Sequence, residues 1–155
     1  GHFGYSKGAH DLWNGVRTLT NDELPFEISP ADELPDHVDW REKGVVTAVK
    51  DQGGCGSCWA FAAAATLESH IAIETGTLFN LAPQEYVSCM PNPDKCGGEG
   101  GCKGATVDMA YDWMMKKGGI VQEFQMGYTS YYGEDGNCTI ADNLQEGLLG
   151  RTRDG

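Results

Sequence analysis

The sequence is most informative at Gln52-Gly53-Gly54-Cys55-Gly56-Ser57-Cys58-Trp59-Ala60-Phe61. Cys58 follows a glycine-rich turn and precedes a run of helix-forming residues, so we expect it at the first turn of a helix. The unpaired N–H groups and partial positive charge at a helix N-terminus favour a thiolate, the nucleophilic form of cysteine. The stretch therefore predicts a nucleophilic cysteine.

Gln52 lies upstream of this thiol and carries a side-chain amide that can donate hydrogen bonds. The intervening glycines let the chain turn tightly enough for this amide and the Cys58 main-chain N–H to converge on one oxygen. Such a pair of donors stabilises the oxyanion formed in acyl transfer. We expect Gln52 to be an oxyanion donor; the simpler alternative is a surface glutamine in a turn.

No histidine of the sequence is placed to act as the general base for Cys58. His70 lies further along the same expected helix, about 18 Å away at a rise of 1.5 Å per residue, whereas proton transfer needs a contact of about 3 Å. His2 and His10 fall in a linker-like region, and His37 precedes the first expected strand without a supporting motif. We expect the base to be encoded outside these residues.

Three helices are expected from helix propensity, apolar spacing and stop signals. They cover residues 58–75, 83–89 and 105–117. Gly76 and Gly118 act as stops, and Pro83 suits a first helical position, although Ala82 before it is a poor N-cap.

Apolar residues surround the first half of the first helix, so we expect that half to be buried all round. Met109, Trp113 and Met114 should pack in the core. Residues 40–49 suggest a turn followed by a short strand, and the glycine- and proline-rich stretch 90–104 a loop.

Composition argues against several classes of protein. The chain has 155 residues and a net charge of −12, and its acidic residues are spread out, so we expect no nucleic-acid partner. No apolar run approaches the roughly 20 residues that cross a membrane, so no membrane partner is expected either. We expect no cofactor and no metal.

The six cysteines allow other interpretations. Cys55 and Cys58 form a C-x-x-C pattern, as in thioredoxin-like redox proteins, but no βαβ pattern surrounds them. Cys55, Cys58, Cys96 and Cys102 could form a four-thiolate zinc site, although the spacing of the second pair is longer than usual.

Beyond the Cys58 stretch, four further segments match the motifs of one known family. They are Leu34–Arg41 (LPDHVDWR), Leu81–Cys89 (LAPQEYVSC), Gly101–Ala105 (GCKGA) and Gly127–Tyr132 (GYTSYY) followed by Cys138. With Cys58 and Glu68 they resemble the papain-like, cathepsin-type cysteine proteases over residues 34–138. That resemblance implies an α+β papain-like fold, of which this chain holds the mainly helical left domain, with a central helix that starts at the nucleophile. A C-terminal β-rich domain supplying His and Asn is expected to be absent from the chain, and the cleft lies between the two halves.

The resemblance also implies roles for individual residues. Cys58 is the expected nucleophile, with Gln52 in the oxyanion hole. The expected disulfides are Cys55–Cys102 and Cys89–Cys138. Gly104 and Ala105 would offer main-chain groups to a substrate strand, and Thr106 and Val107 would border the pocket for the second residue before the scissile bond.

Three positions depart from the family pattern: Ala82 replaces a capping serine, Ala105 replaces a glycine, and Cys96 is additional. The additional thiol either stays unbonded or pairs with a cysteine outside the chain. The methyl group of Ala105 stands where the substrate backbone passes.

The expected organisation is a propeptide end or linker (1–33), the left half of the peptidase domain (34–138) and a polar tail (139–155). The leading hypothesis is a fragment of a cysteine endopeptidase that acts through an acyl-thioester at Cys58, inactive alone, from a lysosomal, vacuolar or secreted protein. Its expected partners are peptide or protein substrates and cystatin-like inhibitors. The rival hypothesis is a naturally short, non-catalytic binding protein, such as a protease inhibitor or decoy.

Overall fold

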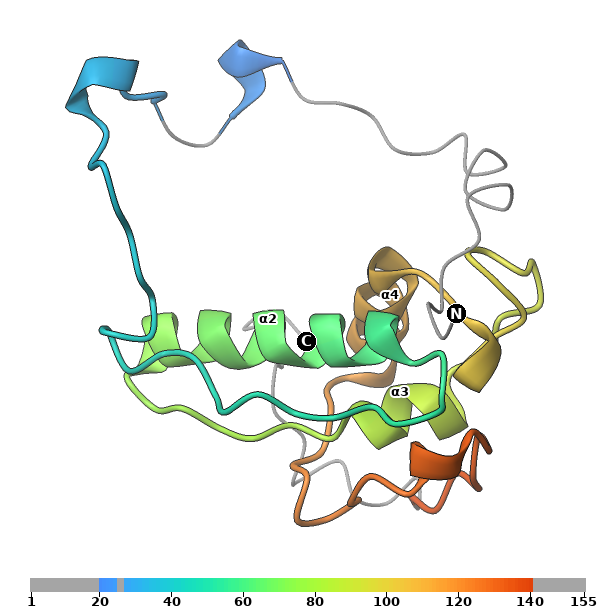
Figure 1. Cartoon of the computed structure of the whole chain (residues 1–155). Coiled ribbons are helices and arrows are strands. Elements are labelled where there is room, and N and C mark those ends of the chain that lie inside the picture. The colour runs from blue at the N-terminus through green and yellow to red at the C-terminus, as the bar shows by residue number, and fades with distance from the viewer. Residues whose placement is uncertain (1–19, 25–26, 141–155) are drawn as a thin grey trace.

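The computed structural model describes residues 20–24 and 27–140. Its α-helices are α2 (Cys58–Thr75), α3 (Pro83–Cys89) and α4 (Val107–Lys117), shown in Figure 1. Single-turn 3-10 helices occur at Asn21–Glu23, Ala31–Glu33, Gly101–Lys103 and Ser130–Tyr132. The described residues contain no β-strand; one isolated antiparallel bridge pairs Leu81 with Gln122. The expectation of a mainly helical domain is confirmed.

Helix α2 has the bounds expected from the sequence. It ends because Gly76 adopts a left-handed conformation (φ 74°) and donates its N–H to the carbonyl of Ala72 at 2.9 Å. Its first half is not buried all round, however. Trp59, Ala60, Ala63 and Ala64 are buried, whereas Ala62 and Ala65 are exposed. The prediction was wrong because α3 and α4 pack on only part of the helix surface.

Helix α3 begins at Pro83 as expected, and Ala82 gives it no side-chain cap. Buried contacts stabilise it instead. The side-chain oxygen Oε1 of the buried Gln84 accepts hydrogen bonds from the main-chain N–H groups of Thr129 and Ser130, at 2.8 and 3.0 Å. Tertiary packing thus stabilises a helix that is too short to be stable alone.

Helix α4 begins two residues later than expected because Thr106 is extended (φ −109°, ψ 153°) and precedes the helix. Of the three residues expected in the core, Met114 is buried, whereas Met109 and Trp113 are half-buried and pack against the core cluster. The core-packing prediction holds best for Met114.

An aromatic series connects the three helices. The ring of Trp59 in α2 lies 6.4 Å from that of Tyr86 in α3, which lies 6.0 Å from Trp113 in α4. Tyr86 is fully buried, and this burial raises the pKa of its phenol. The core of the domain is therefore centred where α2, α3 and α4 meet.

Residues 40–49 form the expected turn but not the expected strand. The turn is closed by three successive main-chain hydrogen bonds, in which the N–H groups of residues 42, 43 and 44 donate to the carbonyls of residues 39, 40 and 41. The segment after it has no partner strand in the described chain. Val46 and Val49 are exposed. The segment runs alongside α2 towards Cys58 (Figure 1).

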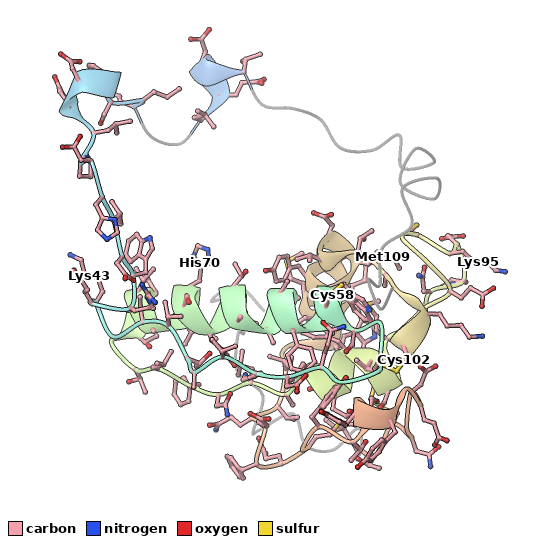
Figure 2. All side chains as sticks on the ribbon, viewed as in Figure 1. Lys43, Cys58, His70, Lys95, Cys102 and Met109 are labelled. Atoms are coloured by element: carbon pink, nitrogen blue, oxygen red, sulfur yellow. A yellow bond between two sulfur atoms is a disulfide. The ribbon has the colours of Figure 1, made fainter. Side chains whose placement is uncertain are left out.

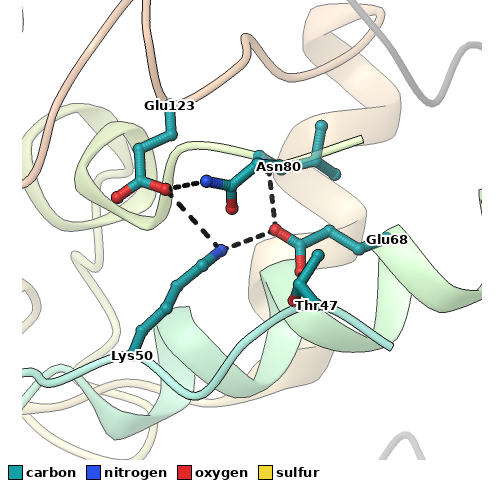
Figure 3. A network of polar contacts seen from close by, with 6 residues as sticks. Thr47, Lys50, Glu68, Asn80 and Glu123 are labelled. Carbon is teal, nitrogen blue, oxygen red and sulfur yellow. Dashed lines mark hydrogen bonds and ion pairs between the residues drawn. The ribbon is translucent and has the colours of Figure 1, made fainter. Parts of the chain in front are cut away.

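A buried carboxylate fastens this segment to α2 (Figure 3). Glu68 is fully buried and accepts hydrogen bonds from Thr47 Oγ1 (2.5 Å), Lys50 Nζ (2.7 Å) and the Leu81 main-chain N–H (2.7 Å). Glu123 also lies near Lys50, with an N–O distance of 4.0 Å. A buried charge needs such partners because desolvation is costly.

Two disulfides, Cys55–Cys102 and Cys89–Cys138, connect residues 47 and 49 positions apart. They are the pairs that the family resemblance implies. Closing loops of this length stabilises the folded state by about 4 kcal/mol each on the chain-entropy estimate.

The described residues before the domain lie apart from the helical body (Figure 1). Residues 27–30 and 32–38 are exposed and lead to the end of α2 distant from Cys58. Among the helices of the described chain, none has the length and apolar character needed to cross a membrane.

Candidate active site

Cys58 is the first residue of α2, an 18-residue helix, and lies outside both disulfides. It is half-buried and opens onto a pocket of about 390 Å³. The pocket is lined by Cys58, Trp59, Ala62, Ala105, Thr106, Val107 and Asp108. The thiol thus combines a helix N-terminus, which favours an anion, with access from a concave surface.

Tyr128 connects the residue before Cys58 with Gln52. Its hydroxyl donates to the main-chain carbonyl of Gln52 at 2.8 Å and shares a hydrogen bond with the Ser57 hydroxyl at 2.7 Å. Its ring packs edge-on against Phe61 at 4.8 Å. Burial raises the pKa of the Tyr128 phenol; the Ser57 hydrogen bond lowers it and the nearby charge of Asp51 raises it further.

Ser57 is fully buried and stands at the N-cap position of α2, yet its side chain makes no capping hydrogen bond. A serine at this position usually bonds an N–H group of the first helical turn. Here its hydroxyl bonds Tyr128 instead. The first turn of α2, where Cys58 lies, is therefore not neutralised by a side-chain cap from Ser57.

The side chain of Gln52 is held at the start of the turn. Its amide nitrogen donates to the carbonyl of Cys55 at 2.7 Å, and the N–H of Gly56 donates to the carbonyl of Cys102 at 2.9 Å. The amide nitrogen carries two N–H groups, so this bond orients the amide within the turn. The Cys55–Cys102 disulfide fastens the same turn to the loop before α4.

The turn requires glycine at position 53. Gly53 has a φ of 62°, and a Cβ there would lie 2.3 Å from the carbonyl oxygen of Tyr131. The same oxygen accepts a hydrogen bond from the N–H of Gly54 at 2.7 Å. Close backbone approach therefore holds the turn against the 3-10 helix at Ser130–Tyr132.

The four residues expected to contact a substrate differ in their environment. Gly104 uses its N–H and carbonyl within the loop, bonding Gly101 at 3.4 Å and Gly100 at 2.8 Å. Ala105, Thr106 and Val107 line the pocket beside Cys58, and Gly104 does not. The Thr106 hydroxyl is buried and has no hydrogen-bond partner in the described structure. Of the two candidates for main-chain contact, Ala105 is better placed than Gly104.

The described histidines lie away from Cys58. His70 is exposed on α2 and lies well along the helix from Cys58 (Figure 2). His37 is exposed in the segment before the domain. His2 and His10 are outside the described residues. Neither described histidine therefore lies beside Cys58.

The disulfides exclude the two alternative interpretations of the cysteines, the redox pair and the zinc site. Because Cys55 is bonded to Cys102, it forms neither a redox pair with Cys58 nor a thiolate ligand of the four-cysteine zinc site. Elsewhere in the described chain, His37, Asp39 and Glu42 lie close enough to share an ion. Asp39 is already bound by the Arg41 guanidinium, whose hydrogen bond lowers the pKa of its carboxyl group.

Sequence reasoning missed several residues of the site. Tyr128 stood in a recognised motif but was given no role, because its partners lie 71 and 76 positions away in the chain. Ala62 and Asp108, which line the pocket, were also missed. Helical spacing could have found Ala62, since it lies four residues after Cys58 and so on the same face.

The chain is similar to known cysteine proteases in sequence. The family model described as papain family cysteine protease matches residues 34–151. Cysteine proteinase 15A of Pisum sativum is 44% identical over 114 residues, which are 72% of this chain and 31% of the relative. Senescence-specific cysteine protease SAG39 of Oryza sativa subsp. japonica is 36% identical over 169 residues, covering 94% of this chain and 48% of the relative.

Solved structures are similar as well. The digestive procathepsin L2 proteinase from Tenebrio molitor larval midgut has a TM-score of 0.73 at 30% identity, covering 97% of this chain and 43% of that one. The bromelain protease of Ananas comosus, solved with the E64 inhibitor, has a TM-score of 0.59 at 33% identity, covering 74% and 46%. The chain spans less than half the length of these relatives. Its sequence and fold nevertheless place it in one family: the chain belongs to the papain family of cysteine proteases.

Proposed function

We propose that this chain is part of a cysteine endopeptidase in which Cys58 is the nucleophile. The observation that carries the proposal is the position of its thiol, at the N-terminus of α2 and beside a pocket. The thiolate attacks the carbonyl carbon of a peptide bond, and the amine leaves after taking a proton. Water then hydrolyses the acyl-thioester, releasing the acid and restoring the thiol.

The oxyanion of each tetrahedral intermediate is assigned to two donors, the Gln52 amide and the Cys58 main-chain N–H. Gln52 is held at two points. Its side-chain amide donates to the Cys55 carbonyl, and its main-chain carbonyl accepts a hydrogen bond from the Tyr128 hydroxyl. A donor fixed before the reaction begins costs no reorganisation in the transition state. Such preorganised donors stabilise the transition state more than they stabilise the bound substrate.

The pocket beside Cys58 is proposed to bind the substrate side chain two residues before the scissile bond. Thr106 and Val107 border it, and Ala105 offers main-chain groups to the substrate strand, with Gly104 in support of the loop. The apolar side chains of the pocket suit an apolar substrate group. Substrates are peptides or proteins, and cystatin-like inhibitors would compete for the same surface.

We further propose that this chain alone is inactive, because the base and the residue that orients it lie in a part of the protein outside the 155 residues. Residues 1–33 would be the end of a propeptide, 34–138 the left half of the catalytic domain, and 139–155 the start of the remainder. Its disulfides suit an oxidising compartment, so a lysosomal, vacuolar or secreted protein is proposed.

Activity of the complete reading frame tests the proposal. Peptide hydrolysis by the processed protein should be lost in Cys58→Ala and kept in Cys96→Ala, the other thiol outside the disulfides. Comparing these two variants separates the effect of losing the proposed nucleophile from the effect of losing a half-buried thiol in general. Hydrolysis that persists in Cys58→Ala would overturn the assignment.

A non-catalytic binding protein is the second candidate, favoured by the exposed segment ahead of the domain. A stop codon directly after Gly155 in the transcript would support it. A reading frame that continues into a segment with His and Asn would exclude it.

A further inference from the structure

The segment after the last 3-10 helix contains an acceptor sequence for N-linked glycans. Asn137-Cys138-Thr139 is the only Asn-x-Ser/Thr triplet with a non-proline centre among the 155 residues. We propose that Asn137 is N-glycosylated. The proposal rests on the secretory route included in the proposed function, and it does not depend on peptidase activity.

The structure presents the triplet on the surface. Asn137, Cys138 and Thr139 are all exposed and lie outside any helix or strand. Acceptor sites occur in surface loops, because the glycan is bulky and must remain in solvent. None of the residues that line the pocket beside Cys58 belongs to this segment.

The residues on either side of Asn137 are anchored to the domain. The Asp135 carbonyl accepts hydrogen bonds from Ser88 Oγ at 2.6 Å and Gln84 Nε2 at 3.0 Å. Cys138 is bonded to Cys89 at the end of α3. Asn137 therefore stands between two fixed points, and a glycan on it would leave both sets of contacts in place.

The cysteine in the centre of the triplet adds a constraint. Cys89 precedes Cys138 by 49 residues, so it reaches an oxidising lumen first and the bridge can close as soon as Cys138 follows. A closed bridge ties the triplet to α3, whereas glycan transfer needs an extended and accessible chain. We infer that the disulfide and the glycan compete, and that only a fraction of chains is glycosylated.

The chemical step requires a polyprenyl-diphosphate oligosaccharide as the co-reactant. The amide nitrogen of Asn137 forms a bond to C1 of the sugar, and the bond from C1 to the diphosphate oxygen breaks. The polyprenyl diphosphate leaves with the electron pair, and one amide proton passes to a base of the transferring enzyme.

The test expresses the full 155-residue chain behind a cleavable secretory signal in a eukaryotic host. An amidase that removes N-glycans should increase the gel mobility of part of the wild-type chain and convert Asn137 to an aspartate detectable by mass spectrometry. Asn137→Gln and Thr139→Ala should abolish the shift, whereas Thr139→Ser, which keeps the hydroxyl, should retain it.

A control for entry into the lumen comes from Thr75→Asn, which completes an acceptor triplet with Gly76 and Thr77 in an exposed stretch. If Thr75→Asn is glycosylated in the Asn137→Gln background and the wild-type chain is not, the proposal is overturned. Cys89→Ser should raise the glycosylated fraction, and an unchanged fraction would overturn the competition with the disulfide. Because the host supplies the signal, a negative result here is distinct from failure of the proposed peptidase.

Discussion

Tyr128 donates a hydrogen bond to the main-chain carbonyl of Gln52 at 2.8 Å. The same hydroxyl contacts Ser57, so one side chain joins the proposed oxyanion donor to the residue before the proposed nucleophile. Tyr128→Phe removes both hydrogen bonds, so it should destabilise the chain by about 2 kcal/mol, at a usual net contribution of about 1 kcal/mol for each bond. It should also slow peptide hydrolysis by the complete protein through kcat more than through KM.

Tyr132→Phe is the matched control, because Tyr132 is exposed and its ring contacts only Tyr131 among described aromatic groups. It should leave both unfolding and kcat unchanged. Equal effects of the two substitutions would contradict a specific role for the Tyr128 hydroxyl.

Removal of the buried carboxylate of Glu68 should be costly. Glu68→Ala leaves Lys50 without its closest charge partner, so we expect a loss of about 3–5 kcal/mol in the free energy of unfolding. Glu68→Gln, which keeps the shape of the side chain, should cost less. Urea unfolding followed by circular dichroism measures both, with Glu134→Gln as an exposed control.

Two glycines with similar backbone dihedral angles should differ in the cost of substitution by alanine. Gly53 (φ 62°) and Gly44 (φ 67°) are both left-handed, but only Gly53 has atoms within reach of an added Cβ. Gly44→Ala should therefore cost about 1–2 kcal/mol from backbone strain alone. Gly53→Ala should cost clearly more and displace Tyr131. Similar midpoints of thermal unfolding for the two variants would contradict the close approach.

Loss of a disulfide should lower stability by about 4 kcal/mol. Cys138→Ala removes the bridge to Cys89, whereas Cys96→Ala removes a thiol outside the bridges. Thermal unfolding of the two variants should differ strongly, and the Cys96→Ala chain should resemble the wild type. A stable Cys138→Ala chain would indicate that the bridge adds little.

Alkaline pH should reveal the phenols of the buried Tyr86 and the half-buried Tyr128. Burial raises the pKa of Tyr86 and Tyr128 above the ordinary value of about 10. The folded state keeps these phenols protonated, so their contribution to stability is fully present below about pH 10 and is lost as the pH rises further. Tyr86→Phe and Tyr128→Phe should therefore each remove one of two contributions to the late-titrating tyrosinate absorbance, whereas Tyr132→Phe should leave both intact.

Local sequence signals predicted the helices well, because helix propensity and a left-handed glycine act within a few residues. The bounds of α2 and the start of α3 at Pro83 followed from such signals. Contacts between distant residues did not follow. The Glu68–Lys50 pair and the Tyr128 hydrogen bonds join segments 18 to 76 positions apart, and no local pattern encodes them.

Burial was predicted less well for a related reason. The alanines of α2 gave no periodic signal, so the packed and exposed faces could not be distinguished. The strand expected in 40–49 failed because its β-branched residues indicate propensity, whereas a strand needs a partner to pair with. Thr106 was expected to border the pocket and to lie within a helix; it lines the pocket, but it is extended and precedes α4.

The most direct test of the account is covalent labelling of Cys58 by a peptidyl epoxide, located by peptide mass mapping. The account predicts rapid labelling of Cys58 in the complete protein and none at a comparable rate in the 155-residue chain, because activation of the thiol requires an imidazole encoded elsewhere. Rapid and selective labelling of Cys58 in the isolated chain, or labelling of Cys96 in its place, would contradict it.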